Sequence, residues 1–436
     1  MLKPSKMNAM KKCIFQTKRM IAFGGFLLVS ISAFPQSETL LTLDTCYAIA
    51  QRNYPLVKQM SLIEKAKDYS IENTSKSYLP QFSINGQATY QSEVTEFPVK
   101  LPNVLIDPVS KDQYKIYGEI IQPITDLFTI STQKEMVRTT AEIEHKKTEV
   151  ELYKLKDRIT NLYFGILLID GQLRQTDLLK KDIQSGIDKT KAAIANGTAL
   201  KSNIQLLQAE LLKADQRNIE LLSNRKAYKE MLSLFLSLPL NENILLQTPT
   251  TQVISEQINR PEQKLFELQK KTFDIQKKLL TAKYFPKANL FLQGGYGRPA
   301  LNMLNNELNS YYFGGLRLNW NITGYYTLKK EKKILELNQY SYDIQNETFL
   351  FNTKIILTQQ NIEVNKYEQL ISKDNEIILL RENIKTTSKV QLEFGAITAI
   401  DYLTNINAED QAKQNLLLHQ IQLLLAEYNS LSTSGN

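Results

Sequence analysis

The chain has 436 residues and a formal net charge of +8, a balance that could indicate a nucleic-acid-binding protein. However, residues 1–36 hold six Lys or Arg and no acidic residue, and subtracting these six from +8 leaves +2 for the rest of the chain. That remainder is too small for a basic binding surface, so composition excludes nucleic acid as an expected partner.

The first 36 residues are predicted to be a secretory signal peptide. Basic residues occur up to Arg19, an apolar stretch runs from Met20 to Val29, and small residues follow up to Ala33. This order is typical of a signal peptide, and we expect cleavage between Ala33 and Gln36. A membrane anchor is the alternative, but the apolar stretch is shorter than the ~20 residues that a spanning helix needs.

The sequence contains no motif for catalysis, a cofactor or a metal. Cys13 precedes the apolar stretch, so a lipid anchor is not expected, and Cys46 is predicted to be a small buried apolar side chain. His145 and His419 are far apart in sequence and lack neighbouring ligands at metal spacing. Since phosphate loops, dinucleotide fingerprints and nucleophile elbows are also missing, no enzymatic activity is predicted.

Four segments alternate between polar and apolar residues, which predicts strands with one polar, solvent-facing side and one apolar side. They cover residues of about 81–92, 113–123, 288–297 and 311–322, and Pro80 and Pro286 directly precede the first and third. Each is close to the length of about 9 to 11 residues that a tilted strand needs to cross a bilayer. A soluble antiparallel sheet would give the same alternation. The predicted export signal, together with the sequence duplication described below, favours strands that cross a membrane over a soluble sheet.

The segments between and after these strands are predicted to be long helices. Neither the stretch from Ile124 to Leu238 nor the chain after Ala300 contains proline. Apolar residues recur there at spacings of three and four. They include Leu152, Leu155, Ile159, Leu162, Ile166 and Ile169, with a partner set of Ile355, Ile362, Leu370, Ile377, Leu380 and Ile384. Helices of this length require neighbours that cover their apolar seams.

Gly197 and Gly395 are predicted to end the long outgoing helices. A glycine in the left-handed conformation commonly terminates a helix. Helical residues resume at Ser202 to Leu238 and at Ile400 to Leu431. Both glycines are therefore expected at the tips of helical hairpins.

These landmarks occur twice at matching spacings. Pro80 and Tyr90 are ten residues apart, as are Pro286 and Tyr296. Ile124 precedes Gly197 by 73 residues, and Ile322 precedes Gly395 by 73 residues. The pattern predicts a duplicated domain around a pseudo-symmetry axis, with one repeat at residues 37–236, a linker at 237–261 and a second repeat at 262–436.

The arrangement from Leu41 to Leu431 resembles the TolC-like outer membrane factors, the outer membrane efflux protein family. The resemblance rests on Tyr-x-Pro before each strand hairpin, Ile-Thr before each long helix, and a glycine tip before each returning helix. In the second copy Gly395 is followed six residues later by Asp401 and a hydrophobic pair, as in that family. The first copy has Asn203 at the position of Asp401.

The resemblance implies a mainly α-helical fold with a membrane β-barrel portion. Each duplicated unit would contribute a long coiled-coil helical hairpin and two strands, and a homotrimer would close a 12-stranded β-barrel and an α-helical periplasmic barrel. Residues 237–261 would form part of an equatorial belt. Physical reasoning agrees that chains must associate, because an open sheet edge in lipid leaves backbone groups unsatisfied at several kcal/mol each. With four strands per chain, two chains would form an eight-stranded barrel filled by side chains. Three chains would form a twelve-stranded barrel wide enough for a water passage.

The implied function is an outer membrane channel of a tripartite efflux or type I secretion system. It would passively conduct substrates delivered by an inner-membrane pump and a periplasmic adaptor (membrane fusion) protein, with its helical portion in the periplasm and its strands against outer membrane lipid. The hairpin tips would dock the adaptor. The residues concerned are Asn196, Gly197, Thr198, Ala199 and Leu200 in the first tip, and Phe394, Gly395, Ala396, Ile397 and Thr398 in the second.

The resemblance also implies a periplasmic gate at Asp401, Thr404 and Asn203. Three Asp401 carboxylates in a narrow neck would raise one another's pKa and favour cations. Thr404 replaces the family's second acid and Ile397 its basic residue. The alternative for Asp401 is a carboxylate that stabilises the start of its helix.

Two other classes of protein share some of these features. A periplasmic adaptor has a signal peptide and a helical hairpin, but this chain has two predicted hairpins, each preceded by strands. An envelope-spanning coiled-coil structural protein would account for the helices alone.

Overall fold

The computed structural model describes residues 40–95, 108–241, 244–251 and 257–436. The chain divides into two units, residues 1–39 and 40–436, and only the second contains described residues. The predicted signal peptide at residues 1–36 and parts of the predicted linker, residues 242–243 and 252–256, therefore lie outside the described residues.

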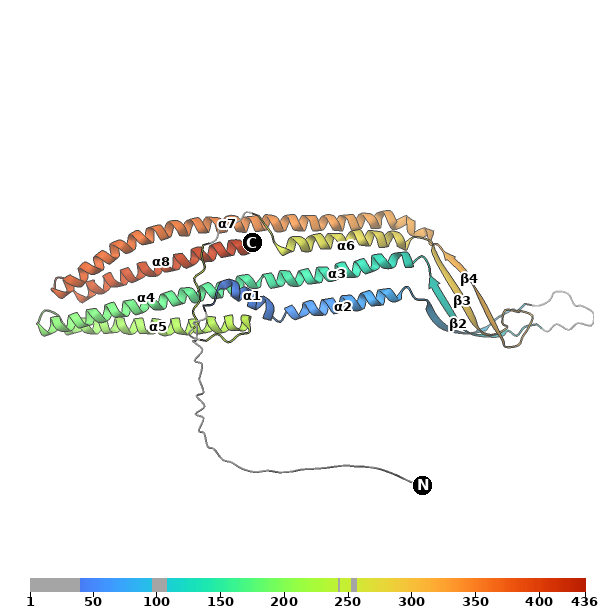
Figure 1. Cartoon of the computed structure of the whole chain (residues 1–436), viewed down its shortest axis with the longest axis horizontal. Helices are drawn as coiled ribbons and strands as arrows, with labels where there is room; N and C mark the ends of the chain where they lie inside the picture. Colours follow the sequence, from blue (N-terminus) through green and yellow to red (C-terminus); the bar gives the residue numbers. More distant parts are fainter. Residues whose placement is uncertain (1–39, 96–107, 242–243, 252–256) are drawn as a thin grey trace, which may run out of the picture. The chain divides into compact units, whose positions relative to one another are not determined.

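The second unit consists of long helices and an antiparallel sheet (Figure 1). Its first half contains α1 (Leu43–Asn53), α2 (Val57–Lys76), β1 (Gln81–Tyr90), β2 (Asp112–Pro123), α3 (Leu127–Tyr153), α4 (Leu155–Ala195) and α5 (Lys201–Leu236). Its second half contains α6 (Pro261–Lys283), β3 (Lys287–Arg298), β4 (Asn309–Asn319), the short 3-10 helix η1 (Ile322–Gly324), α7 (Tyr325–Glu393) and α8 (Ala399–Ser434). Within this unit the sheet lies at one end of the helices, and the α4–α5 and α7–α8 turns lie at the other (Figure 1).

The sheet has four antiparallel strands in the order β1-β2-β3-β4. Phe82 pairs with Ile120, and Ile120 pairs on its other side with Leu292. Directly paired residues of antiparallel strands point to the same side of the sheet, so these three share one face. The bounds of β2 and β3 lie within one residue of the predicted ones, whereas those of β1 and β4 differ by two or three residues. β1 ends at Tyr90 rather than at residue 92, and β4 spans Asn309–Asn319 rather than residues 311–322, since η1 turns the chain toward α7.

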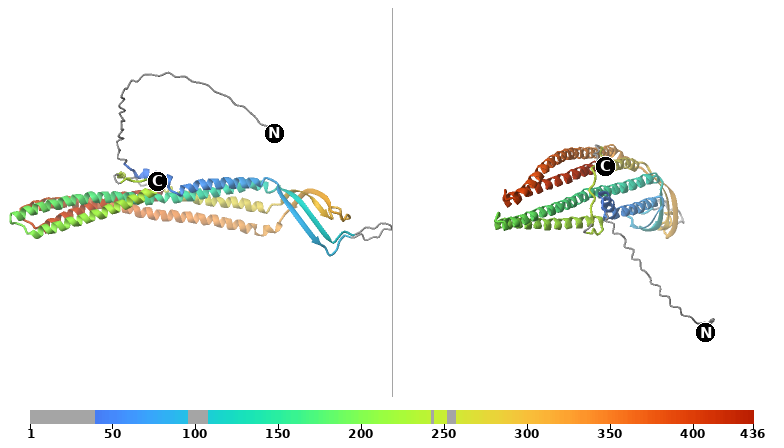
Figure 2. Two further views of the ribbon diagram at one scale, coloured as in Figure 1. Left: turned by 90° about the horizontal axis from the view of Figure 1, so that it is seen from below. Right: turned by 60° about the vertical axis from the view of Figure 1, so that its left-hand side comes forward.

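The two long helical stretches differ in continuity. α7 is a single helix of 69 residues, whereas α3 and α4 are separated at Lys154. Lys154 has φ −63° and ψ −16°, which are right-handed helical values, so α4 continues in the direction of α3 (Figure 1). The views in Figure 2 also show α7 beside α8 and α4 beside α5.

One core cluster joins α1, α4, α5 and α8. Tyr163 is fully buried in it, and its hydroxyl oxygen lies 2.7 Å from the carbonyl oxygen of Leu41 and 2.6 Å from that of Gln247, so that its one hydrogen can be donated to either. These contacts fasten to α4 two segments that are also paired with each other, since the amide of Gln247 donates to the carbonyl oxygen of Leu41 at 3.1 Å. Cys46 is fully buried in the same cluster, which confirms its predicted apolar role, and burial raises the pKa of its thiol to about 12.

A second core cluster lies toward the hairpin turns. Ile183, Leu207, Tyr402 and Ile406 are buried there between α4, α5 and α8. This cluster holds the two helical hairpins against each other. Across the described ranges, no helix combines the length and the apolar character needed to cross a membrane.

Candidate functional site: the hairpin tips, the sheet and the face of α7

The two hairpin tips have the same backbone geometry. Gly197 has φ 77° and Gly395 has φ 71°, so both adopt the predicted left-handed conformation. The amide of Thr198 donates to the carbonyl oxygen of Ala193 at 2.9 Å, and that of Ala396 donates to Gln391 at 2.8 Å. These bonds close each helix end as in a Schellman motif. A Cβ atom at either glycine would meet nothing within 4 Å, so backbone conformation rather than space requires glycine.

The second tip contains a capping box at the start of α8. The amide of Asp401 donates to the Thr398 hydroxyl at 3.2 Å, and the amide of Thr398 donates to Asp401 Oδ2 at 3.0 Å. The Thr398 hydroxyl also donates to Asp401 Oδ2 at 2.6 Å. These hydrogen bonds lower the pKa of Asp401 from its ordinary value, which is opposite to the change expected for three clustered carboxylates. In the single chain, Asp401 caps its helix.

The first tip lacks this capping box. Leu200 stands at the N-cap of α5, where it makes no side-chain cap, and Asn203 stands where α8 has Asp401. The first turn of α5 contains no acidic residue. Thr404, one turn further along α8, is exposed and donates its hydroxyl to the carbonyl oxygen of Ile400 at 2.9 Å. The predicted gate residues Asp401, Thr404 and Asn203 therefore lie at the same end of the unit, and among the described residues no hydrogen bond joins any two of them.

Large apolar side chains are exposed at both tips. Phe394 is 81% exposed and Leu200 is 71% exposed, whereas Ile397 is half-buried against the second core cluster. Asn196 and Ala396 are exposed beside the glycines. Exposed apolar side chains around a rigid turn form a surface suited to contact with another protein.

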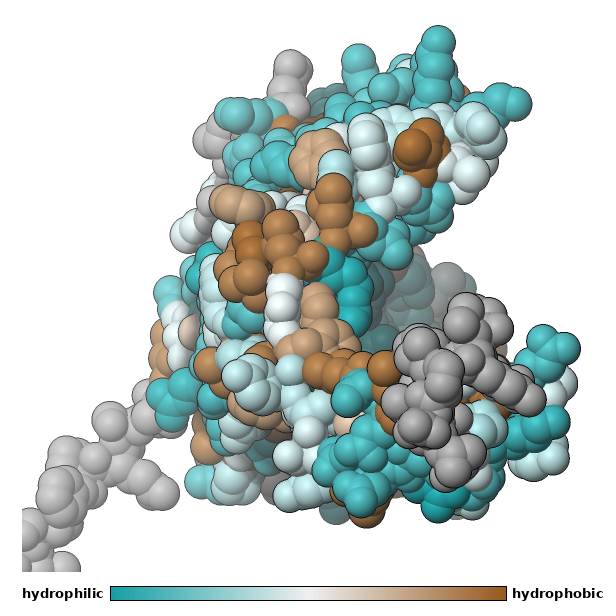
Figure 3. Space-filling view, turned by 90° about the vertical axis from the view of Figure 1, so that its right-hand side faces the viewer, coloured by the Kyte–Doolittle hydropathy of each residue, from teal (hydrophilic) through white to brown (hydrophobic). Residues whose placement is uncertain are grey.

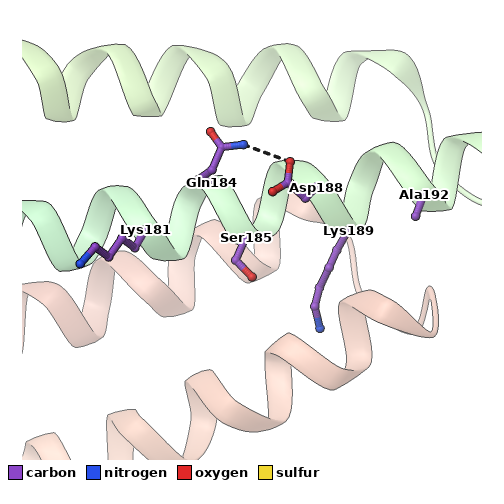
Figure 4. Close-up of a pocket in the computed structure, with 6 residues that line it drawn as sticks. All are labelled: Lys181, Gln184, Ser185, Asp188, Lys189 and Ala192. Atoms are coloured by element: carbon purple, nitrogen blue, oxygen red, sulfur yellow. Dashed lines mark hydrogen bonds between the residues drawn. The ribbon is translucent and has the colours of Figure 1, made fainter.

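An ion pair that the sequence did not reveal connects the two hairpins near their tips. Lys189 of α4 places Nζ 2.5 Å from Glu393 Oε2 at the end of α7, and the ion pair lowers the pKa of Glu393. Lys189 also lines an open groove of about 580 Å³ on α4 (Figure 4). The other lining residues are Lys181, Gln184, Ser185, Asp188 and Ala192. The groove is open to solvent, and all but one of its lining residues have polar or charged side chains. Within it, Gln184 donates to Asp188 at 3.0 Å.

A charged cluster joins three helices behind the tips. Lys385 of α7 lies 2.9 Å from Asp182 Oδ2 on α4 and 3.2 Å from Glu409 Oε1 on α8. Glu409, although only 3% exposed, also contacts Lys413. A buried carboxylate requires such cationic partners. The cluster fixes the relative positions of α4, α7 and α8.

At the junction of the sheet with the helices, Thr125 links β2 to β3. Its hydroxyl donates to the carbonyl oxygen of Pro286 at 3.0 Å and accepts the amide of Ala288 at 2.9 Å. The amide of Ile124 donates to the Ala288 carbonyl oxygen at 2.8 Å. The predicted strand-preceding residue Pro286 is therefore part of a hydrogen-bonded joint. Pro80 precedes β1 at the outer edge of the sheet.

The two faces of the sheet differ in polarity. Glu119 of β2 and Arg317 of β4 lie on one face, with Arg317 Nη2 3.2 Å from Glu119 Oε1. The other face presents exposed apolar side chains, among them Phe82, Ile84, Tyr312 and Leu316. Figure 3 looks at the sheet end of the unit and shows hydrophobic residues gathered on the surface there.

The predicted apolar seam of α7 is largely uncovered. Ile355, Ile362, Ile377, Leu380 and Ile384 are exposed, in contrast to Leu152, Leu155, Ile159, Ile166 and Ile169 of the first half, which are buried. α7 buries a different set, including Leu357 and Val364. We call the five exposed residues the α7 seam. The sequence periodicity predicted the α7 seam, but it could not show that the other helices of the same chain leave the seam exposed to solvent.

Neither a protein-family model nor a curated protein matches this sequence. Solved structures, however, match over most of both chains. CusC, from structures concerned with transmembrane channel formation, has a TM-score of 0.67 and 14% identity over 90% of this chain and 91% of its own. The open-state MtrE outer membrane channel of Neisseria gonorrhoeae has a TM-score of 0.66 and 13% identity over 90% and 89%.

A third structure is the outer membrane protein VceC of Vibrio cholerae, with a TM-score of 0.65 and 11% identity over 90% of this chain and 96% of its own. At these identities the likeness concerns the fold. Together with the two hairpins and the four-stranded sheet, it shows that this chain has the fold of the TolC-like outer membrane factors.

Proposed function

We propose that this protein is an outer membrane channel of a tripartite efflux or type I secretion system, and that it works as a homotrimer. The observation that carries this proposal is the α7 seam together with the open sheet edges at β1 and β4. Exposed apolar surface of this extent marks an interaction site, and an open strand edge is a template for pairing with another chain.

A duplicated unit explains what would cover the α7 seam. Ile362 follows Phe164 by 198 residues, the same interval that separates Ile322 from Ile124. Phe164 is 1% exposed because Tyr428 of α8 packs on it, with ring centroids 5.6 Å apart, whereas Ile362 is 64% exposed. Within the chain, α8 packs against α4. The repeat makes α7 the counterpart of α4 and α5 the counterpart of α8. In a cyclic assembly, α5 of the next copy would therefore pack against α7 in the same way.

The paired strands support the same duplication. Gln81 pairs with Ile121 in the first hairpin, and Lys287 pairs with Asn319 in the second. The partners in these pairs are separated by the intervals of the sequence landmarks, 206 residues for β1 and β3 and 198 for β2 and β4. Equal registers in both hairpins are what a repeated unit requires.

Three copies would join their sheets into a 12-stranded barrel. The apolar face, with Ile84 and Tyr312, would contact lipid, and the polar face, with Glu119 and Arg317, would line the passage. Twelve strands leave room for water, and closure satisfies the edge strands. The signal peptide predicted at residues 1–36 would direct export to the envelope.

The helices would then form the periplasmic part of the channel. The tips around Gly197 and Gly395 would dock a periplasmic adaptor, and an inner-membrane pump would deliver the substrate. Asp401, Thr404 and Asn203 would lie near the constriction. Conduction is passive in this proposal, so the chain supplies a path and a gate and performs no chemistry.

The migration of detergent-extracted envelope protein in SDS gels tests the proposal. A band at trimer mass in unheated samples that collapses to monomer after boiling, recovered from the outer membrane fraction, is the expected result. Recovery of the protein as a soluble monomer in the periplasm would overturn the channel, the trimer and the location together.

A further inference from the structure

We propose that Thr323 fastens each chain to the next one, by bonding the backbone around Pro80 and Phe82 of the neighbouring copy, and that this bond fixes the register of β4 against β1. The inference rests on the proposed trimer and adds to it a residue-level joint. It assigns a role to a threonine that makes only local contacts within the single chain.

The template for this joint is present inside the chain. Thr125 donates to the Pro286 carbonyl oxygen at 3.0 Å and accepts the Ala288 amide at 2.9 Å, while Ile124 donates to the Ala288 carbonyl oxygen at 2.8 Å. These three hydrogen bonds, with a longer one of 3.4 Å from the Thr125 amide to the Ala288 carbonyl oxygen, link the end of β2 to the start of β3. They satisfy backbone groups that would otherwise be orphaned at the barrel rim.

Each member of this joint has a counterpart at the outer edges of the sheet. Thr323 follows Thr125 by 198 residues, and Pro80 and Phe82 precede Pro286 and Ala288 by 206. These are the same two intervals that relate the strand pairs of the two hairpins. By these intervals Thr323 is the counterpart of Thr125, and each threonine lies in the short connection between its strand and the following long helix, Thr323 within η1.

The two threonines differ in solvent exposure, as expected if the partner of Thr323 is supplied only by a neighbouring copy. Thr125 and Ile124 are half-buried, whereas Thr323 and Ile322 are exposed. The Thr323 hydroxyl donates to Oδ1 of its neighbour Asn321 at 2.6 Å. Rotation about its Cα–Cβ bond can exchange this local bond for the Pro80 carbonyl oxygen of an arriving copy.

The joint also specifies which residues face each other across the boundary. Within the chain Ile121 pairs with Phe291 and Glu119 pairs with Gln293. The same intervals pair Asn319 with Asn85, and Arg317 with Gln87, of the next copy. All four residues lie on the polar face of their strands, whereas a shift of one residue would place Arg317 opposite the apolar face.

A cysteine pair can measure this register. Ala288 directs its amide and carbonyl groups toward β2, and every second residue after it does the same. Phe291 therefore directs these groups away from β2, so Ile121 and Phe291 form a non-hydrogen-bonded pair. In such pairs the two side chains approach each other most closely. The corresponding pair is Asn319→Cys with Asn85→Cys. These positions occupy opposite edge strands of one sheet, so a disulfide between them joins two chains. Cys46 can remain, because it is fully buried.

Oxidation in native membranes, followed by boiling and a non-reducing gel, should give covalent dimers and trimers for Asn319→Cys with Asn85→Cys. Arg317→Cys with Asn85→Cys, displaced by two residues, is the matched control and should remain monomeric. Stronger cross-linking of the control pair would overturn the proposed register while leaving the trimer intact. Absence of any trimer before boiling would instead overturn the proposed function itself, and this inference with it.

A second set of variants tests the hydroxyl. Thr323→Val should lower the temperature at which the trimer dissociates in the gel, Thr323→Ser should restore it, and the amount of folded monomer should not change. Thr125→Val, which breaks the joint within one chain, should also lower the protease resistance of the monomer. Equal dissociation temperatures for wild type and Thr323→Val would show that the hydroxyl does not fasten the copies.

Discussion

The side chains and backbone amides of Thr398 and Asp401 exchange hydrogen bonds at the start of α8, at 3.2 Å and 3.0 Å. This reciprocal pair stabilises the ionised carboxylate and keeps the pKa of Asp401 low. It also holds the carboxylate at a fixed place beside the second hairpin tip. In a trimer, three such carboxylates would carry full charge near the proposed constriction.

The first prediction separates these two roles of Asp401. Asp401→Asn should preserve trimer yield, because asparagine can still accept the Thr398 amide, but should reduce the preference for cations in planar bilayer recordings. Thr404→Asp should increase that preference by adding an acid one turn along the same helix. Unchanged selectivity in both variants would leave Asp401 with only its capping role.

The second prediction concerns the tip glycines. Gly197→Val and Gly395→Val should each strain the left-handed turn by roughly 1 kcal/mol or more and abolish export while trimers still form. Asparagine tolerates this conformation better, so Gly197→Asn and Gly395→Asn are the matched controls and should retain partial export. Full transport by the valine variants would show that the tips do not contact the adaptor.

The third prediction concerns the ion pair between Lys189 and Glu393. Lys189→Glu should repel Glu393 and separate the ends of α4 and α7, which should raise single-channel conductance. The stability of the trimer should change little, because exposed pairs contribute about 0–1 kcal/mol. Combining Lys189→Glu with Glu393→Lys should restore the original conductance. A double variant that conducts like the single one would mean that the pair does not hold the tips.

The fourth prediction concerns the α7 seam. Ile362→Glu and Ile377→Glu place a charge on surface that the neighbouring copy should bury, so unheated gels should show loss of trimer. Circular dichroism should report unchanged helix content, since both residues are exposed in the single chain. Asn365→Glu, at another exposed position of α7, is the control and should leave trimers intact. Normal trimers in all three variants would contradict the proposed packing.

Local features of the chain were predictable from the sequence. Gly197 and Gly395 interrupt long stretches free of helix breakers, so their left-handed geometry followed from neighbouring residues alone. The two faces of the strands followed from their period of two. The Thr398 and Asp401 spacing is itself a capping signal, although it could not separate a cap from a gate.

Contacts between distant segments could be decided only by the tertiary structure. The joint of Thr125 with Pro286 and the pair of Lys189 with Glu393 each connect residues more than 150 positions apart, and periodicity does not say which faces meet. Nor could it show that α3 and α4 are separate helices while α7 is continuous. The sequence by itself determined which segments form helices, strands and turns, because that depends mainly on neighbouring residues. The tertiary structure decided which apolar seam is covered and which is left for another chain, because burial depends on how helices from both halves pack together.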